Sequence, residues 1–269
     1  MTITAVALFL LHLPSAPAQN PSPLDTLVDV GGYHMHLAVY RGTKQLTIVL
    51  ESGGGASLGS WSGVEAELAA RTQATVVAYD RAGFGKSGTG PGDLTPRRQI
   101  EQLHEALDAL RTPAERIIVG HSYGGLLAIL HAHLYPGNVR GLVLVDPMNL
   151  RFVQATGDFV YSTVPHIEHP ASRRDTALVR LVNTFDGLVR DPDAGDVGLR
   201  MPIVIITAGD DWWGKADIDR AWRRSHEAIA QAAPHRRLVA ADRSNHDIPE
   251  KRPDTIVDAV LSLTAGRPN

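Results

Sequence analysis

The segment Ile117–Gly125 constrains the fold of this 269-residue chain more than any other, because it places a serine between two structural patterns. The preceding run, Arg116–Val119, has the β-branched residues of a buried strand, and an apolar helical pattern begins at Tyr123. Between them lies the sequence G-x-S-x-G, with Ser122 at its centre. So tight a turn from strand to helix strains the serine backbone and leaves room only for glycine on either side. We expect the turn to expose the Ser122 hydroxyl as a nucleophile.

Short apolar runs alternate with helical patterns along most of the chain. The expected strands are Leu27–Val30, Met35–Tyr40, Leu46–Leu50, Thr75–Tyr79, Arg116–Val119, Gly141–Val145, Ile203–Thr207 and Arg237–Ala240. The expected helices are Trp61–Arg71, Pro96–Arg111, Tyr123–Tyr135, Asp217–Ala233 and Pro253–Thr264. Gly31-Gly32 indicates a hairpin between the first two strands, and the later, unalternated runs suit strands buried on both faces of a parallel sheet. The pattern predicts the α/β class, with a mostly parallel, doubly wound sheet and a ligand site at the carboxyl ends of its strands.

The segment 147–201 interrupts this alternation. It has no strong strand signal, contains several short helical stretches, and is too long for a bare loop in a compact domain. We therefore expect residues 147–201 to form a small helical cap over the ligand edge of the sheet. Residues 19–146 and 202–269 then form the core.

Residues 1–18 have features of a signal peptide. The apolar run Ala5–Leu13 is too short to span a bilayer, and Ala16-Pro17-Ala18 provides a cleavage site before Gln19. The first four residues depart from the usual pattern, because they include no Lys or Arg. We expect export to the periplasm or the medium, with a cytoplasmic location as the alternative.

Composition excludes several classes of partner and chemistry. The net charge of −3 gives no reason to expect nucleic acid or an acidic membrane surface as a partner. The chain has no cysteine, so disulfides, thiolate metal sites and cysteine nucleophiles are excluded. No apolar run after the leader is long enough for stable membrane insertion. We expect no metal and no cofactor, and the sequence leaves the oligomeric state open.

A serine hydroxyl needs a base to take its proton, and His246 is the expected base. It lies in the loop after the last expected strand, before the helix that begins at Pro253. The nearest rival, His235, precedes that strand and would lie at the opposite edge of the sheet. The order of nucleophile and base along the chain is the one that accompanies this serine motif.

An acyl-transfer site also needs two backbone N–H donors for the oxyanion. The residue after the nucleophile, Tyr123, should supply one. The glycine run after the third expected strand should supply the other, because glycine lets the backbone approach a substrate closely. Gly54 is the favoured donor, with Gly53 and Gly55 as alternatives.

Four motifs in this order resemble the α/β-hydrolase superfamily, and most closely its esterase-like "alpha/beta fold hydrolase" group. The motifs are Leu50–Gly55 with Trp61, Ala78–Ser87, Val119–Gly125 and Gly141–Pro147. The resemblance extends from about Asp25 to the C-terminus, apart from the expected cap. It implies the α/β-hydrolase fold, with Ser122 as nucleophile, His246 as base, and Gly54 and Tyr123 as oxyanion donors. It says little about the substrate.

The sequence offers more than one candidate for the acid of the triad. In the superfamily the acid usually follows the strand after the cap, three residues beyond a glycine, but that position here is Trp212. Asp211 and Asp210 are the neighbouring candidates. Other members place the acid at the end of the strand after the nucleophile helix, where this chain has Asp146. We favour Asp146, with Asp211 and Asp210 as alternatives.

The function expected from these residues is hydrolysis of an ester-like bond in a small molecule, through an acyl-enzyme intermediate and a Ser-Asp-His triad. Alternatives within the hydrolases are peptidase, lactonase, C–C hydrolase and perhydrolase activities. An alternative of another class is a binding protein of this fold with little turnover. The serine nucleophile argues against the epoxide-hydrolase and haloalkane-dehalogenase branches, which attack with Asp.

Overall fold

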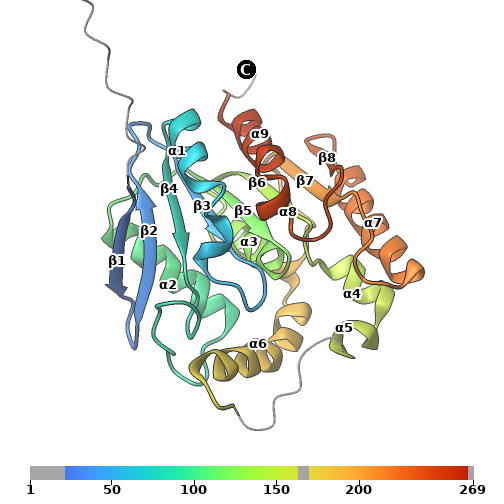
Figure 1. The fold of residues 1–269 in the computed structure, drawn as a ribbon, viewed down its shortest axis with the longest axis horizontal. Helices are drawn as coiled ribbons and strands as arrows, with labels where there is room; N and C mark the ends of the chain where they lie inside the picture. Colours follow the sequence, from blue (N-terminus) through green and yellow to red (C-terminus); the bar gives the residue numbers. More distant parts are fainter. Residues whose placement is uncertain (1–21, 163–169, 266–269) are drawn as a thin grey trace, which may run out of the picture.

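The computed structural model describes residues 22–162 and 170–265, and the expected signal peptide lies outside these residues. One eight-stranded sheet forms the centre, in the order β1-β2-β4-β3-β5-β6-β7-β8 (Figure 1). The strands are β1 Leu24–Asp29, β2 His34–Tyr40, β3 Thr47–Glu51, β4 Thr75–Tyr79, β5 Arg116–His121, β6 Val139–Val145, β7 Ile203–Ala208 and β8 Arg236–Ala241. The β1–β2 and β2–β4 pairs are antiparallel, and every later pair is parallel. This confirms the predicted mostly parallel sheet of the α/β-hydrolase fold.

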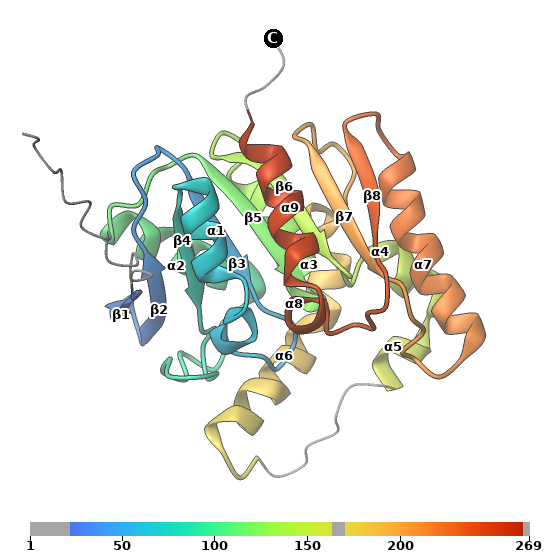
Figure 2. The same ribbon diagram turned by 45° about the horizontal axis from the view of Figure 1, so that its top comes forward.

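Helices cover both faces of the sheet (Figures 1 and 2). On one face, α1 (Glu65–Thr72) and α9 (Pro253–Thr264) pack against the strands through a continuous apolar cluster. On the other face, α2 (Pro96–Ala109), α3 (Tyr123–Leu134) and α7 (Ala216–Gln231) form a second cluster with the sheet. The sheet is therefore doubly wound, as its strand–helix alternation predicted.

Helix α2 illustrates how the local sequence sets an element. The Thr95 side chain accepts a hydrogen bond from the Arg98 N–H, and Pro96 occupies the first turn, where its missing N–H costs nothing. Ile100 and Leu103 lie on one helical face and are fully buried. The helix thus begins at its cap and buries the face that the apolar spacing predicted.

The segment between β6 and β7 contains α4 (Leu150–Thr156), α5 (Asp158–Ser162), α6 (Arg173–Arg190) and the short helix η2 (Pro192–Ala194). The sequence predicted only short helical stretches here, but α6 is a single helix of 18 residues. A reciprocal capping box between Ser172 and Asp175 begins it. Helix α6 lies across the carboxyl ends of the strands (Figure 2). Its designation as part of a cap stays a prediction.

Two further details differ from the sequence-based expectation. Strand β8 is an edge strand whose residues 237–240 are exposed or half-buried, and Leu238 keeps 38% of its surface exposed, so this strand is not buried on both faces. The helix expected over Trp61–Arg71 is instead divided into η1 (Leu58–Trp61), which ends at the fully buried Trp61, and α1. The Trp61 indole Nε1 donates to Ser52 Oγ over 3.1 Å, which ties η1 to the loop after β3.

Candidate active site

Ser122 occupies the turn between β5 and α3 in a strained conformation, with φ 54° and ψ −122°. Its N–H donates to the Val145 carbonyl over 3.0 Å. A Cβ added to Gly120 would lie 2.4 Å from the Gly124 carbonyl oxygen, and one added to Gly124 would lie 2.4 Å from the Glu51 carbonyl oxygen. Both glycines of the motif are therefore required by the close packing of this turn.

His246 and Asp146 meet at the carboxyl edge of the sheet. Asp146 directly follows β6, is fully buried, and has a left-handed backbone with φ 41°. His246 lies in the loop between β8 and α8 (Ile248–Lys251). Its Nδ1 donates to Asp146 Oδ2 over 2.7 Å, while the Ala208 N–H donates to Asp146 Oδ1 over 2.9 Å. The end of β7 thus fixes the carboxylate that orients the imidazole.

The pKa of Asp146 decides the tautomer of His246. Burial acts to raise this pKa, but the hydrogen bonds from His246 and from the Ala208 N–H together bring it below its usual value. An ionised carboxylate can only accept hydrogen bonds, so His246 Nδ1 carries a proton. In the neutral imidazole, Nε2 then keeps a free lone pair, the state that a general base requires.

The other two acid candidates lie elsewhere. Asp210 and Asp211 are exposed, and the Asp211 carboxylate pairs with Arg223. No hydrogen bond joins either carboxylate to His246 among the described residues. The neighbouring Trp212 stacks on the His246 ring, with centroids 4.0 Å apart and planes 13° from parallel.

His226 is a buried neighbour of Asp146 that the sequence did not indicate. Its Nε2 lies 2.9 Å from the Pro147 carbonyl, which can only accept, so Nε2 is the protonated nitrogen. Its Nδ1 then accepts from Thr207 Oγ1 over 2.9 Å and lies 3.7 Å from Asp146 Oδ1. Burial lowers the pKa of His226 and keeps it neutral. Its position on the apolar face of α7, one turn after Trp222, is the only sequence signal.

His121 supports the base loop from the other side. Its Nε2 donates to the His246 carbonyl over 2.9 Å, and the two rings lie 4.6 Å apart. Burial, together with the nearby His246, lowers the pKa of His121 to about 4. A neutral His121 therefore holds the backbone of His246 without adding a charge beside it.

The expected oxyanion donors lie next to each other and next to the serine. Gly53, Gly54, Ser122 and His246 line one hollow of about 260 Å³. A Cβ added to Gly54 would lie 3.5 Å from the Tyr123 Cβ. Tyr123 is the first residue of α3, so its N–H has no partner within the helix and lies at the positive end of the helix dipole.

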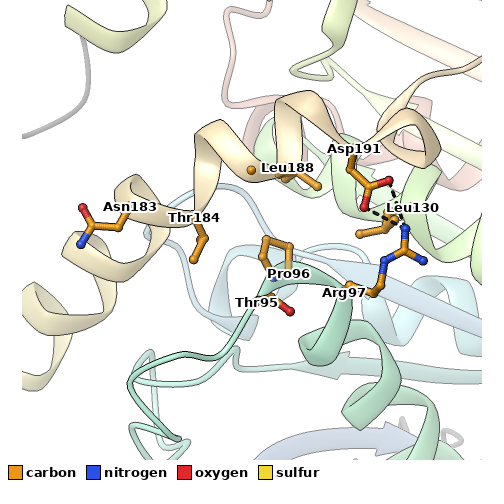
Figure 3. A pocket seen from close by; sticks show the side chains of 9 residues that line it. Thr95, Pro96, Arg97, Leu130, Asn183, Thr184, Leu188 and Asp191 are labelled. Atoms are coloured by element: carbon orange, nitrogen blue, oxygen red, sulfur yellow. Dashed lines mark hydrogen bonds and ion pairs between the residues drawn. The ribbon is translucent and has the colours of Figure 1, made fainter.

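A second, larger hollow of about 430 Å³ lies between α6 and the start of α2. Figure 3 shows Asp191 bound to Arg97 at one end and Asn183 at the other. Only Leu130 of its lining residues belongs to α3, and it lies about two helical turns after Ser122. Among the residues that line it there is no nucleophile paired with a base, so the smaller hollow remains the candidate active site.

The described residues contain no group of three His, Asp or Glu side chains arranged to hold a metal ion. None of the described helices has the length and apolar character needed to cross a membrane. His36, on β2, contacts two carboxylates, Asp80 and Asp25, each over 2.7 Å.

The fold and the arrangement of the candidate site are typical of α/β hydrolases. Comparison with known protein families gives the same class. Residues 48–259 match the model of the Alpha/beta hydrolase family, and the chain belongs to that family.

Three individual proteins that the chain resembles share about a quarter of its residues or fewer over the aligned length. The chain is 26% identical over 236 residues to the uncharacterized protein YqjL of Bacillus subtilis, covering 87% of this chain and 89% of that protein. Among solved structures it is similar to a thermophilic esterase from Thermogutta terrifontis, with a TM-score of 0.64, 20% identity, and coverage of 91% and 97%. It is also similar to a serine hydrolase involved in carbazole degradation, with a TM-score of 0.67, 21% identity, and coverage of 91% and 100%. At these identities the solved structures show the fold alone.

Proposed function

We propose that this α/β hydrolase is a serine esterase that cleaves an ester-like bond of a small molecule through an acyl-enzyme. One observation carries the proposal. Ser122 and His246 line the same hollow, and a buried, ionised Asp146 holds His246 in the tautomer of a base.

The reaction follows from these positions. His246 Nε2 takes the Ser122 proton as Oγ attacks the carbonyl carbon, and the carbonyl oxygen becomes an oxyanion. The N–H groups of Gly54 and Tyr123 are the proposed donors to that oxyanion. The imidazolium then gives its proton to the leaving alcohol. Water, activated by the same imidazole, attacks the acyl-enzyme, releases the acid and restores Ser122.

The size of the hollow bears on the substrate. Ligand pockets for drug-sized molecules begin at about 300 Å³, and this hollow has about 260 Å³. The lining includes Ala56 and Pro249, and also two carboxylates, Asp247 and Glu250. A short, uncharged acyl group suits this lining better than an anionic one, because like charges repel.

A fluorophosphonate probe tests the proposal. It should form a covalent adduct with Ser122 and none with Ser60, as peptide mass mapping would show. Ser60 lines the same hollow, but its hydroxyl donates to the Ser57 carbonyl and not to a histidine among the described residues. Ser122→Ala should remove labelling and lower kcat on 4-nitrophenyl acetate by about 10⁶, as in other serine enzymes. The exposed Ser62→Ala serves as the matched control.

The proposal is wrong if the wild-type chain is not labelled, or if Ser122→Ala keeps a tenth of its turnover. A series of 4-nitrophenyl esters of increasing acyl length, with a lactone and an amide beside them, would then define the substrate class. Turnover should fall as the acyl chain outgrows the hollow.

A further inference from the structure

A buried arginine lies directly beneath the loop that carries Gly54. Arg81 follows β4 and has only 3% of its surface exposed. Its Nη1 donates to Glu51 Oε1 over 2.9 Å and to the Ser52 carbonyl over 2.5 Å. Its Nη2 donates to the Gly53 carbonyl. One guanidinium therefore holds two successive carbonyls of the loop after β3.

The second of these carbonyls belongs to the peptide that contains the Gly54 N–H. A trans peptide is planar, and its C=O and N–H point in opposite directions. Because Arg81 binds the Gly53 oxygen, the Gly54 N–H points away from Arg81. Gly53 and Gly54 line the hollow beside Ser122, and Arg81 is not among the residues that line it. The contact thus turns this N–H toward the side on which the substrate would lie.

The same guanidinium lies against the side chain of Tyr123, the residue whose N–H is the other expected donor. Arg81 Cζ is 5.5 Å from the centroid of the Tyr123 ring, within range of a cation–π contact. Arg81 therefore contacts the backbone that carries one proposed donor and the side chain of the residue that carries the other.

Glu51 makes this arrangement possible in the core. It is 1% exposed, pairs with Arg81, and also accepts a hydrogen bond from the Tyr79 hydroxyl. A buried ion pair contributes little to stability compared with an apolar pair of the same volume. Fold stability alone therefore gives no strong reason for the pair, whereas the bidentate shape of the guanidinium suits two adjacent carbonyls.

We infer that Arg81 is a positioning residue of the proposed hydrolase, which orients the Gly53–Gly54 peptide so that its N–H meets the oxyanion. This inference rests on the proposed function. It predicts that loss of the guanidinium weakens binding of the transition state more than binding of the substrate.

Two variants test the role without leaving a buried charge unpaired. Arg81→Lys keeps the charge but loses the fork, and the double variant Glu51→Gln with Arg81→Met removes both charges together. Each should lower kcat by 10- to 100-fold, less than the 10²- to 10³-fold loss of a whole oxyanion donor, with KM changed less than threefold. Burst titration with 4-nitrophenyl acetate corrects kcat for the fraction of active sites.

Arg236→Lys is the matched control. Arg236 is a buried arginine that also holds a carboxylate and a backbone carbonyl, both of Asp196, but it lies away from the hollow. The substitution Arg236→Lys should lower the unfolding temperature and leave kcat per active site unchanged.

A trifluoromethyl ketone separates positioning from a merely structural role, because its serine adduct carries an oxyanion. Its affinity should fall in the Arg81 variants in parallel with kcat/KM. Folded Arg81 variants with unchanged kcat per site and unchanged ketone affinity would overturn the positioning role alone. A wild-type Ser122 that fluorophosphonate does not label would overturn the proposed function as well.

Discussion

Asp146→Asn is the substitution that tests the site most sharply, because asparagine keeps the size and shape of the side chain but replaces the charged acceptor with an amide. The backbone of residue 146 has φ 41°, and asparagine tolerates this left-handed conformation better than most residues. The side-chain oxygen can still accept from the Ala208 N–H. The new NH₂ group then faces His246 Nδ1, where the carboxylate oxygen had been.

The expected loss follows from this hydrogen bond. An NH₂ group donates, so His246 must accept through Nδ1 and carry its proton on Nε2, the nitrogen that should receive the serine proton. Before His246 can act as a base, its proton must move from Nε2 to Nδ1. We expect kcat to fall by about 10⁴, which is about 5 kcal/mol in transition-state stabilisation.

The assay is hydrolysis of 4-nitrophenyl acetate at pH 8, with active sites counted by fluorophosphonate and folding checked by circular dichroism. Asp211→Asn is the matched control, since it removes an exposed carboxylate that pairs only with Arg223 among the described residues. It should change kcat less than twofold. A folded Asp146→Asn with a tenth of wild-type turnover, or an inactive Asp211→Asn, would refute the assignment of the acid.

Three further predictions concern the turn, the core and the leader. Gly124→Ala should destabilise the fold by about 2–4 kcal/mol in urea unfolding, because the new Cβ collides with backbone, whereas Gly137→Ala, in open space, should change stability little. Burial lowers the pKa of His131 to about 3, so the unfolded chain binds a proton that the folded chain does not. Stability should therefore fall on acidification below about pH 6.5, by up to about 1.4 kcal/mol per pH unit from this residue. His131→Leu should flatten that slope, and an unchanged slope would contradict the burial argument. In its own host the mature chain should begin at Gln19, and an intact mass that retains residues 1–18 would speak for the cytoplasmic alternative.

Local sequence predicted the elements whose ends carry strong signals. β4 (Thr75–Tyr79) and α9 (Pro253–Thr264) have the predicted bounds, since a short apolar run marks the first and a proline begins the second. The sequence did not predict α8, a single turn that contains Pro249. It also did not show that β8 lies at the edge, because strand order depends on tertiary pairing.

In the candidate site, too, some residues could be predicted from the sequence and others only from the packing. Ser122 and His246 follow from a motif and a position along the chain, so the sequence was sufficient to propose them. The choice between Asp146 and Asp211 depends on the neighbour that reaches His246, which is a property of packing. Arg81 acts through carbonyl oxygens, and backbone acceptors have no signature in the sequence.

The loop after β7 shows what replaces an acid in its usual place. Superfamily members resembling this chain commonly carry the acid at the position of Trp212, which here stacks on the His246 ring. An indole face attracts a cation, so this contact favours the imidazolium that forms in the proposed mechanism. Asp146 supplies the charge from β6 and Trp212 supplies an apolar cover from β7. Residues after two strands, β6 and β7, thus contact His246 here, whereas in those superfamily members the acid follows one strand, the one after the cap. Trp212→Ala should therefore lower kcat while leaving the Asp146–His246 hydrogen bond in place.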